Sequence, residues 1–218
     1  MNRELLKLYA VTDGTKMPEE KVEKAIKGGV TMVQYRVKDV DDVRKENEAS
    51  GILKVCRKYN VPLIINDDVM LALKIGADGV HVGQEDMSVS RAREFLGDNA
   101  IIGATAKTVE QAKKAENQGA DYLGSGAVFG SMSKLDALPM TRELLSEICH
   151  SVRIPVVAIG GINRNNIESL VGTDISGVAV IGGIFGEEDI TAAAAELYYK
   201  IIKITGGNDD ENSTNYSR

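Results

Sequence analysis

Residues 76–86 read Gly-Ala-Asp-Gly-Val-His-Val-Gly-Gln-Glu-Asp, a stretch in which we expect one helix to end and a buried strand to begin and end. Glycine just past a helix C-terminus accepts the left-handed conformation that stops the helix. The two valines then predict a short strand over Gly79–Val82. Glu85 and Asp86 follow at the carboxyl end of that strand. The stretch therefore predicts one helix–turn–strand unit with polar chemistry at its end.

The same unit recurs along the chain. Related turns stand at residues 28–31 (Gly-Gly-Val-Thr), 119–122 (Gly-Ala-Asp-Tyr) and 172–174 (Gly-Thr-Asp). Apolar runs predict strands at Leu8–Thr12, Met32–Val37, Leu63–Asn66, Gly79–Val82, Ile101–Thr105, Tyr122–Val128, Val156–Gly160 and Val178–Ile181. Between them, amphipathic segments predict helices such as Pro18–Lys27, Asp41–Tyr59, Thr108–Gln118, Thr141–Val152, Asn163–Leu170 and Ile190–Lys203.

This alternation indicates a parallel sheet covered by helices. A turn that repeats with every second unit suits a closed barrel, whose interior layers come from alternate strands. An open doubly wound sheet would require a reversal of strand order, of which the sequence gives no sign. We therefore expect the α/β class, with a single (β/α)8 TIM barrel over residues 1–205. Residues 206–218 have almost nothing to bury and predict a disordered acidic and polar tail.

Composition excludes several classes of function. The 26 Lys and Arg against 32 Asp and Glu give a net charge of −6, which is not the footprint of a protein that binds nucleic acid or a membrane surface. No apolar run predicts a membrane span or a signal peptide. Cys56 and Cys149 are expected as buried thiols, which fits a reducing cytoplasm. The sequence leaves open whether identical chains assemble.

Two neighbouring strands run directly into acid. Asn66, Asp67 and Asp68 end one predicted strand, and Asp86 follows the next. A desolvated carboxylate is costly unless it is paired or holds a metal. The ends of successive parallel strands lie side by side, so Asp67 and Asp86 are candidates to share one hard cation. Mg²⁺ held by one or two carboxylates takes its other ligands from water and substrate phosphate.

The second predicted strand carries cationic and amide side chains. Gln34, Arg36 and Lys38 are spaced by two, so they share one face if the strand continues through them. Such a face predicts a site for an anion. The alternative is an ordinary solvated strand end, because residues 38–41 are polar.

The later strands end in hydroxyl-rich or glycine-rich segments. Thr105 either faces the barrel mouth or packs, and the sequence leaves both open. Residues 124–136 form a long segment with Ser131, Ser133 and Lys134, either a lid over a phosphate or an ordinary mobile loop. Paired glycines at 160–161 and 182–183 let backbone N–H groups approach an anion at the strands where such barrels commonly hold phosphate.

The histidines are weaker candidates. His81 alternates with Val80 and Val82 and is expected as a hydrogen-bonded interior residue rather than a catalyst. His150 lies late in a predicted helix and is expected to be structural. Together, the candidates predict one cation site and two anion sites, which suits a reaction in which diphosphate leaves and a monophosphorylated substrate attacks.

With these motifs in order, the sequence resembles the thiamine-phosphate synthase family from Leu8 to about Lys203. The motifs that carry the resemblance are residues 34–38 (Gln-Tyr-Arg-Val-Lys), 65–68 (Ile-Asn-Asp-Asp), 78–86 (Asp-Gly-Val-His-Val-Gly-Gln-Glu-Asp), 119–124 (Gly-Ala-Asp-Tyr-Leu-Gly) and 159–162 (Ile-Gly-Gly-Ile). The resemblance implies an enzyme that joins 4-amino-5-hydroxymethyl-2-methylpyrimidine diphosphate to a thiazole phosphate, forming thiamine phosphate and diphosphate.

The resemblance also implies roles for matched positions. The pyrimidine diphosphate would be bound by Gln34, Tyr35, Arg36, Val37, Lys38, Asn66, Thr105 and Lys134, of which Arg36, Lys38, Thr105 and Lys134 would be catalytic. The thiazole phosphate would be bound by Ser131, Met132, Ser133, Gly161, Ile181 and Gly182. Asp67 and Asp86 would hold Mg²⁺.

Some positions depart from the family's usual pattern. Val37 stands where Glu is usual, Lys107 where His is usual, and Gly182 where Ser is common, while Thr105, Ser131 and Ser133 keep a hydroxyl. Two alternatives stay open. One is a related thiazole tautomerase, which would not need the metal and diphosphate residues. The other is a non-catalytic phosphate-binding barrel.

Overall fold

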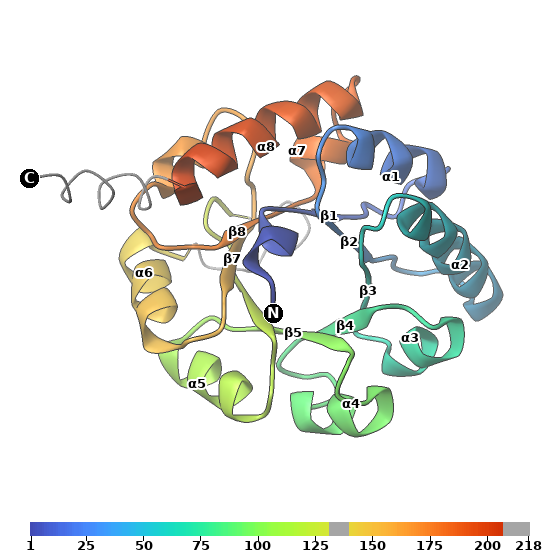
Figure 1. Cartoon of the computed structure of the whole chain (residues 1–218), viewed down its shortest axis with the longest axis horizontal. Helices are drawn as coiled ribbons and strands as arrows, with labels where there is room; N and C mark the ends of the chain where they lie inside the picture. Colours follow the sequence, from blue (N-terminus) through green and yellow to red (C-terminus); the bar gives the residue numbers. More distant parts are fainter. Residues whose placement is uncertain (131–139, 207–218) are drawn as a thin grey trace, which may run out of the picture.

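The computed structural model describes residues 1–130 and 140–206, and over these residues eight parallel strands close into a barrel (Figure 1). Each strand pairs with the next in the sequence, and β8 pairs with β1 to close the ring. The strands are β1 (Leu8–Val11), β2 (Met32–Tyr35), β3 (Leu63–Asn66), β4 (Gly79–Val82), β5 (Ile101–Thr105), β6 (Tyr122–Gly126), β7 (Val156–Ile159) and β8 (Gly177–Val180). The predicted (β/α)8 TIM barrel is confirmed.

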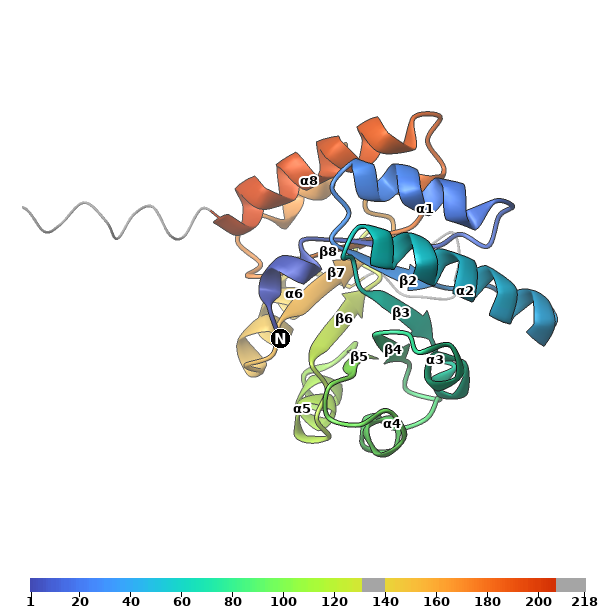
Figure 2. The same ribbon diagram turned by 45° about the vertical axis from the view of Figure 1, so that its right-hand side comes forward.

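Helices form a ring outside the strands, apart from the N-terminal turn η1, which lies over the middle of the barrel in this view (Figure 1). The helical elements are η1 (Arg3–Leu6), α1 (Pro18–Lys27), α2 (Asp42–Lys58), α3 (Val69–Ile75), α4 (Val89–Leu96), α5 (Val109–Asn117), α6 (Arg142–Ser151), η2 (Ile167–Leu170), α7 (Gly182–Phe185) and α8 (Ile190–Gly206). Helices α1 and α8 pack against each other, as both views show (Figures 1 and 2), which joins the first and last units of the barrel.

Two hydrophobic layers follow from the alternation of side chains along each strand. The inward-facing strand residues form an interior core together with Leu6 of η1: Tyr9, Val11, Met32, Ile64, Tyr122, Val157 and Ala179. The outward-facing residues pack under the helices, as Val33, Ile65 and Val80 do. The polar side chains that continue the inward rows toward the carboxyl ends of the strands, such as Gln34 and Asn66, are therefore delivered to the barrel mouth.

The predicted bounds are right for β3, β4, β5 and α1 and too long for several other elements. Strand β2 ends at Tyr35, so Arg36 and Lys38 lie beyond the strand. The predicted helix over Asn163–Leu170 is wrong, because only Ile167–Leu170 is helical, as the 3-10 turn η2. Of the predicted long segment 124–136, residues 131–136 fall within the gap at 131–139, and the predicted tail falls almost wholly in 207–218. Both of these segments lie outside the described residues.

Two further expectations concern membranes and cysteines. Within residues 1–130 and 140–206, no helix is long and apolar enough to cross a membrane. Cys56 and Cys149 are both free thiols. Cys56 is buried as expected, whereas Cys149 is only partly buried.

Candidate active site

A cavity of about 590 Å³ occupies the mouth of the barrel at the carboxyl ends of the strands. Every strand contributes to its wall, from Tyr9 of β1 to Ala179 of β8. Four of the predicted diphosphate-binding residues line it: Gln34, Arg36, Asn66 and Thr105. Thr105, whose direction the sequence left open, therefore faces the mouth.

A second cavity of about 470 Å³ lies beside the first, over the ends of β2, β3 and β4. Its walls include both predicted metal ligands, Asp67 and Asp86, together with Tyr35 and Val37. Asn66 lines both cavities, so the two form neighbouring parts of one polar region. The structure thus brings together the two acidic strand ends, as the sequence predicted.

Asp67 and Asp86 are both exposed, although the sequence predicted them to be desolvated. The expectation that a metal offsets the cost of burying these carboxylates is therefore wrong. Local hydrogen bonds orient them instead. Asn66 Nδ2 donates to Asp67 Oδ2 at 2.5 Å, and the Gly83 N–H donates to Asp86 Oδ2 at 2.8 Å. Two solvated carboxylates on one cavity keep negative charge at this end of the mouth.

Asp68 has a different task from its neighbour. Its Oδ1 accepts from the Leu71 N–H at 2.9 Å and caps helix α3, while its Oδ2 pairs with Lys45 Nζ at 2.6 Å. Burial alone would raise the pKa of Asp68, but the bonds from Lys45 and the helix backbone outweigh burial and hold that pKa below its usual range. Asp68 is therefore a structural carboxylate beside the candidate metal site.

On the β7–β8 side of the mouth, glycine residues expose their backbone to the first cavity. Gly161, Ile181 and Gly182, three of the residues predicted to bind the thiazole phosphate, line the first cavity. A Cβ on Gly161, where φ is +64°, would lie 2.7 Å from the carbonyl oxygen of Phe129, so only glycine fits this crossing. At Gly182 an added Cβ would meet nothing within 4 Å, so this position opens onto free space.

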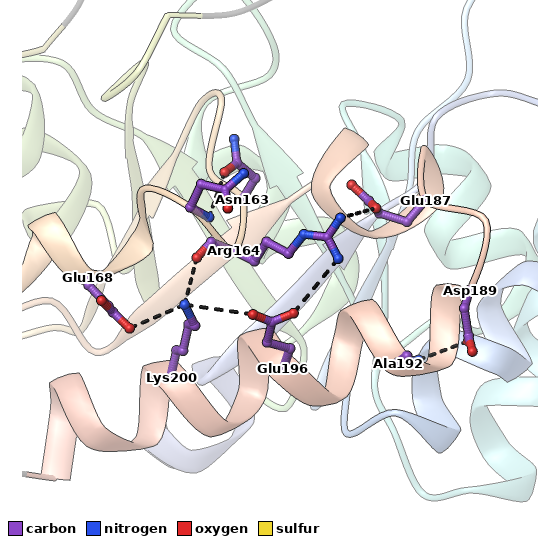
Figure 3. Close-up of polar contacts among 9 residues, drawn as sticks. Asn163, Arg164, Glu168, Glu187, Asp189, Ala192, Glu196 and Lys200 are labelled. Atoms are coloured by element: carbon purple, nitrogen blue, oxygen red, sulfur yellow. Dashed lines mark hydrogen bonds and ion pairs between the residues drawn. The ribbon is translucent and has the colours of Figure 1, made fainter.

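Arg164 is a cation of the mouth that the sequence did not single out. It lines the first cavity after β7, together with Glu187. Figure 3 shows how it is held: its guanidinium lies 3.1 Å from Glu187 Oε2 and 3.9 Å from Glu196 Oε2, and its carbonyl accepts from Lys200 Nζ at 2.8 Å. Helix α8 thus anchors the loop beside the paired glycines. A lone arginine in a polar turn gives no sequence signal of such a position.

Three lining residues of the first cavity, Tyr9, His81 and Thr105, are linked by hydrogen bonds through the buried Tyr122. Tyr9 and Tyr122 share a hydrogen bond of 2.8 Å, and His81 bonds to the hydroxyl oxygens of Tyr122 and Thr105, each at 3.1 Å. His81 is buried and hydrogen-bonded, as expected, but it also lines the cavity. The sequence did not point to Tyr9, which lines the cavity, or to Tyr122, which hydrogen-bonds to two of the lining residues.

Comparison with known proteins bears on what this mouth does. The chain matches the thiamine monophosphate synthase family over residues 8–184. It is similar to the thiamine-phosphate synthase of Clostridium tetani, with 46% identity over 87% of this chain and 93% of that protein. The corresponding protein of Clostridium acetobutylicum is 44% identical over 90% of this chain and 95% of its own length.

A solved structure agrees with these matches. The thiamine phosphate pyrophosphorylase from Pyrococcus furiosus superposes with a TM-score of 0.86 at 39% identity, covering 93% of this chain and 98% of that one. The chain belongs to the thiamine monophosphate synthase family. It is therefore an enzyme, and its reaction is a transfer.

The remaining predicted residues of this synthase-family site are less central or lie outside the described part. Lys38 is exposed and lines neither cavity, and its predicted role on the diphosphate stays a prediction. Lys107, where the family pattern usually has His, lines the first cavity and adds a cation there. Ser131, Met132, Ser133 and Lys134 lie outside the described residues.

The donor set suits the Mg²⁺ that the family implies. Asp67 and Asp86 offer carboxylate oxygens on one open cavity, which is the ligand type a hard cation prefers. Among residues 1–130 and 140–206, no cluster of three or more His, Cys, Asp or Glu side chains could hold a metal by itself.

Proposed function

We propose that this enzyme condenses 4-amino-5-hydroxymethyl-2-methylpyrimidine diphosphate with 4-methyl-5-(2-phosphoethyl)thiazole, giving thiamine phosphate and diphosphate. The family membership supplies the reaction class. The observation that carries the proposal is the division of the mouth: two carboxylates over β3 and β4 on one side, and glycine backbone after β7 and β8 on the other. One side suits a metal-bound diphosphate and the other a single phosphate.

The diphosphate end is assigned to the β2–β4 side. Arg36 and Asn66 line the first cavity and would donate to the diphosphate oxygens, with Lys38 and Lys134 as further cations by family resemblance. Asp67 and Asp86 would hold Mg²⁺, which when bound would neutralise charge on the departing diphosphate. Tyr35 and Val37 would form the apolar wall beside it.

The thiazole phosphate is assigned to the β7–β8 side. The backbone at Gly161 and Gly182 is open to the cavity and would offer N–H donors to a phosphate, with Ile181 against the organic part of the substrate. Ser131, Met132 and Ser133 complete this subsite only by resemblance. Gly182 lacks the side-chain hydroxyl that relatives often carry, so its contribution would be its N–H alone.

The chemistry needs no general base. The bond between the pyrimidine methylene carbon and the diphosphate oxygen breaks, and its electron pair leaves with the diphosphate. The amino group of the pyrimidine delocalises the resulting positive charge. The lone pair of the thiazole nitrogen then forms the new carbon–nitrogen bond, and no proton is transferred. The protein's contribution is to hold the two partners in line and to stabilise the leaving group's charge.

The test is to incubate the purified enzyme with both substrates and Mg²⁺ and to measure thiamine phosphate and diphosphate. We expect the two products in equal amounts, no product when either substrate is omitted, loss of turnover in excess chelator and recovery when Mg²⁺ is restored. Absence of thiamine phosphate with every divalent ion tried would reject the proposed reaction. Full turnover in chelator would reject the metal site alone.

The cellular location of the enzyme, its oligomeric state and its lack of nucleic-acid or membrane partners stay predictions. The two free cysteines are consistent with the reducing cytoplasm expected from the sequence. The negative net charge of −6 gives no reason to expect nucleic acid or a membrane surface as a partner.

A further inference from the structure

A continuous chain of hydrogen bonds crosses the floor of the barrel mouth and ends on two proposed substrate-binding residues. Gln34 Nε2 donates to the Tyr9 hydroxyl at 2.6 Å, and the Tyr9 and Tyr122 hydroxyls lie 2.8 Å apart. The Tyr122 hydroxyl lies 3.1 Å from His81 Nδ1, and His81 Nε2 lies 3.1 Å from Thr105 Oγ1. Five strands, β2, β1, β6, β4 and β5, each supply one member of the chain.

This chain of hydrogen bonds lies in the interior of the barrel and not at its surface. Tyr9 and Tyr122 are 1% and 0% exposed, and Gln34 is 5% exposed. A Cβ at position 103 would lie 2.1 Å from Tyr122 Cζ and 2.5 Å from His81 Nδ1, so Gly103 leaves the space in which these two side chains meet. Burial raises the pKa of Tyr122 well above its usual value, and burial likewise raises that of Tyr9. Both therefore keep the hydroxyl protons that the chain requires.

Each member of such a chain fixes the direction of the next bond. The nitrogen of the Gln34 amide can only donate, so the Tyr9 oxygen accepts and its own proton goes to Tyr122. Tyr122 then donates to His81 Nδ1, which leaves the ring proton on Nε2 to be donated to Thr105 Oγ1. In this direction the cavity is offered the Gln34 carbonyl oxygen as an acceptor and the Thr105 hydroxyl proton as a donor.

Reversal of the chain would change both ends together. If the Gln34 amide were flipped, Tyr9 would donate to its carbonyl oxygen, every later bond would reverse, and Thr105 would donate to His81. The cavity would then be offered a Gln34 N–H donor and a Thr105 acceptor. Because a buried hydroxyl left without a partner is destabilising, mixed arrangements are disfavoured and the two ends stay complementary.

We propose that Tyr9, Tyr122 and His81 are positioning residues that keep Gln34 as an acceptor and Thr105 as a donor, and so select an aminopyrimidine over an oxopyrimidine. The inference rests on the proposed function. An exocyclic amine donates to Gln34 Oε1 and a ring nitrogen accepts from Thr105. An oxygen in place of the amine would meet the Gln34 oxygen, and to bind well it would require the whole chain to reverse.

The test uses Tyr122→Phe, which removes one hydroxyl and keeps the ring. The dissociation constants of the 4-amino pyrimidine diphosphate and its 4-oxo analogue are measured without thiazole phosphate, together with the KM for each substrate of the full reaction. We expect weaker binding of the amino compound and a fall of about tenfold in the amino-over-oxo preference, the value of about one hydrogen bond. The KM for thiazole phosphate should stay unchanged.

The matched control is Tyr59→Phe. Its hydroxyl also makes one hydrogen bond, to Glu23 Oε1 at 2.6 Å, but on the outer helix layer. This variant should keep the wild-type preference even if its melting temperature falls. Tyr9→Phe provides a second variant should Tyr122→Phe fail to fold, and it should lower the preference in the same way because it frees the Gln34 amide.

A double-mutant cycle separates positioning from packing. Thr105→Val removes the hydroxyl that ends the chain of hydrogen bonds and donates to the substrate. In this background, Tyr122→Phe should lower the affinity for the amino compound by less than it does in the wild type. Additive losses, or an unchanged amino-over-oxo preference in both tyrosine variants, would overturn the inference. If the wild type forms thiamine phosphate while the preference is unaffected, only this inference fails. If the wild type forms none, the proposed function fails with it.

Discussion

At the scale of single residues, backbone conformation marks the candidate metal site. Asp67 has a φ of 62°, in the left-handed region that Asp and Asn enter more readily than most residues. The next residue, Asp68, caps α3. One turn therefore ends β3, presents a carboxylate on the second cavity and starts the following helix. Asp67→Asn would remove the charge and keep the left-handed backbone conformation. Asp67→Ala would remove the charge and also strain the backbone, because Ala adopts this conformation less readily.

Ser125 is a buried polar residue on β6 and is 0% exposed. Its Oγ has no hydrogen-bond partner among residues 1–130 and 140–206. A buried hydroxyl without a partner costs about 1–3 kcal/mol, so Ser125→Ala should raise the free energy of unfolding by about 1 kcal/mol. Chemical denaturation measures the change. Ser88→Ala should have the opposite sign, because Ser88 caps α4 by accepting from the Arg91 N–H. A loss of stability in Ser125→Ala would show that its hydroxyl is satisfied in solution.

Some residues of the candidate site can be recognised from a local sequence pattern, whereas others can be recognised only from the folded barrel. Asp67 and Asp86 stand out because acid directly follows an apolar strand, which is a local pattern. Tyr9 and Tyr122 are 113 residues apart, and strand alternation says only that each faces inward. Their meeting depends on the closure of the barrel and on the space left at Gly103. No local pattern carries that information.

At the scale of helices, Glu23 ties α1 to α2. Its Oε1 accepts from Lys58 Nζ at 2.9 Å and from the Tyr59 hydroxyl at 2.6 Å, and Lys27 lies 3.5 Å away. The bond from Lys58, followed by that from Tyr59, lowers the pKa of Glu23 from 4.5 to about 2. A carboxylate with a lowered pKa stabilises the fold at neutral pH, and this contribution is lost as the pH falls.

Glu23→Gln should therefore lower the melting temperature at neutral pH. Its difference from the wild type should be constant above pH 4.5 and should shrink as the pH falls toward about 2, where the wild-type carboxyl becomes neutral too. Thermal unfolding across this range is the measurement. Glu20→Gln, at an exposed glutamate of the same helix, serves as the control. A difference that does not change with pH would mean that the charge of Glu23 plays no part.

Sequence periodicity predicted most elements, and its one wrong helix has a physical cause. Strands β3 to β5 are short apolar runs with glycine or polar residues at their ends, so their bounds are clear. In the segment 163–170 the asparagines bond locally instead: the Asn163 N–H donates to Asn166 Oδ1, and the Asn165 N–H donates to Asn163 Oδ1. Such side-chain bonds compete with a helix. Only the last four residues become helical, as a 3-10 turn.

At the scale of the whole molecule, the two ends of the barrel have different tasks. The carboxyl ends of the strands carry both cavities, Asp67, Asp86 and the paired glycines. The amino ends carry turns such as the one before β8, where Asp174 has a φ of 57° and pairs with His150 Nε2 at 2.8 Å. Asp67 and Asp174 thus share a left-handed backbone and an exposed carboxylate, but lie at opposite ends of the barrel.

This pair gives the most direct test of the claim that the polar mouth forms thiamine phosphate. The measurement is the steady-state rate of thiamine phosphate formation by Asp67→Asn and Asp174→Asn at saturating substrates, over a titration of Mg²⁺. We expect Asp67→Asn to lose about 100-fold or more of the rate and to require more Mg²⁺, because the leaving diphosphate loses charge stabilisation. Asp174→Asn should match the wild type. A wild-type rate and Mg²⁺ requirement in Asp67→Asn would contradict the account.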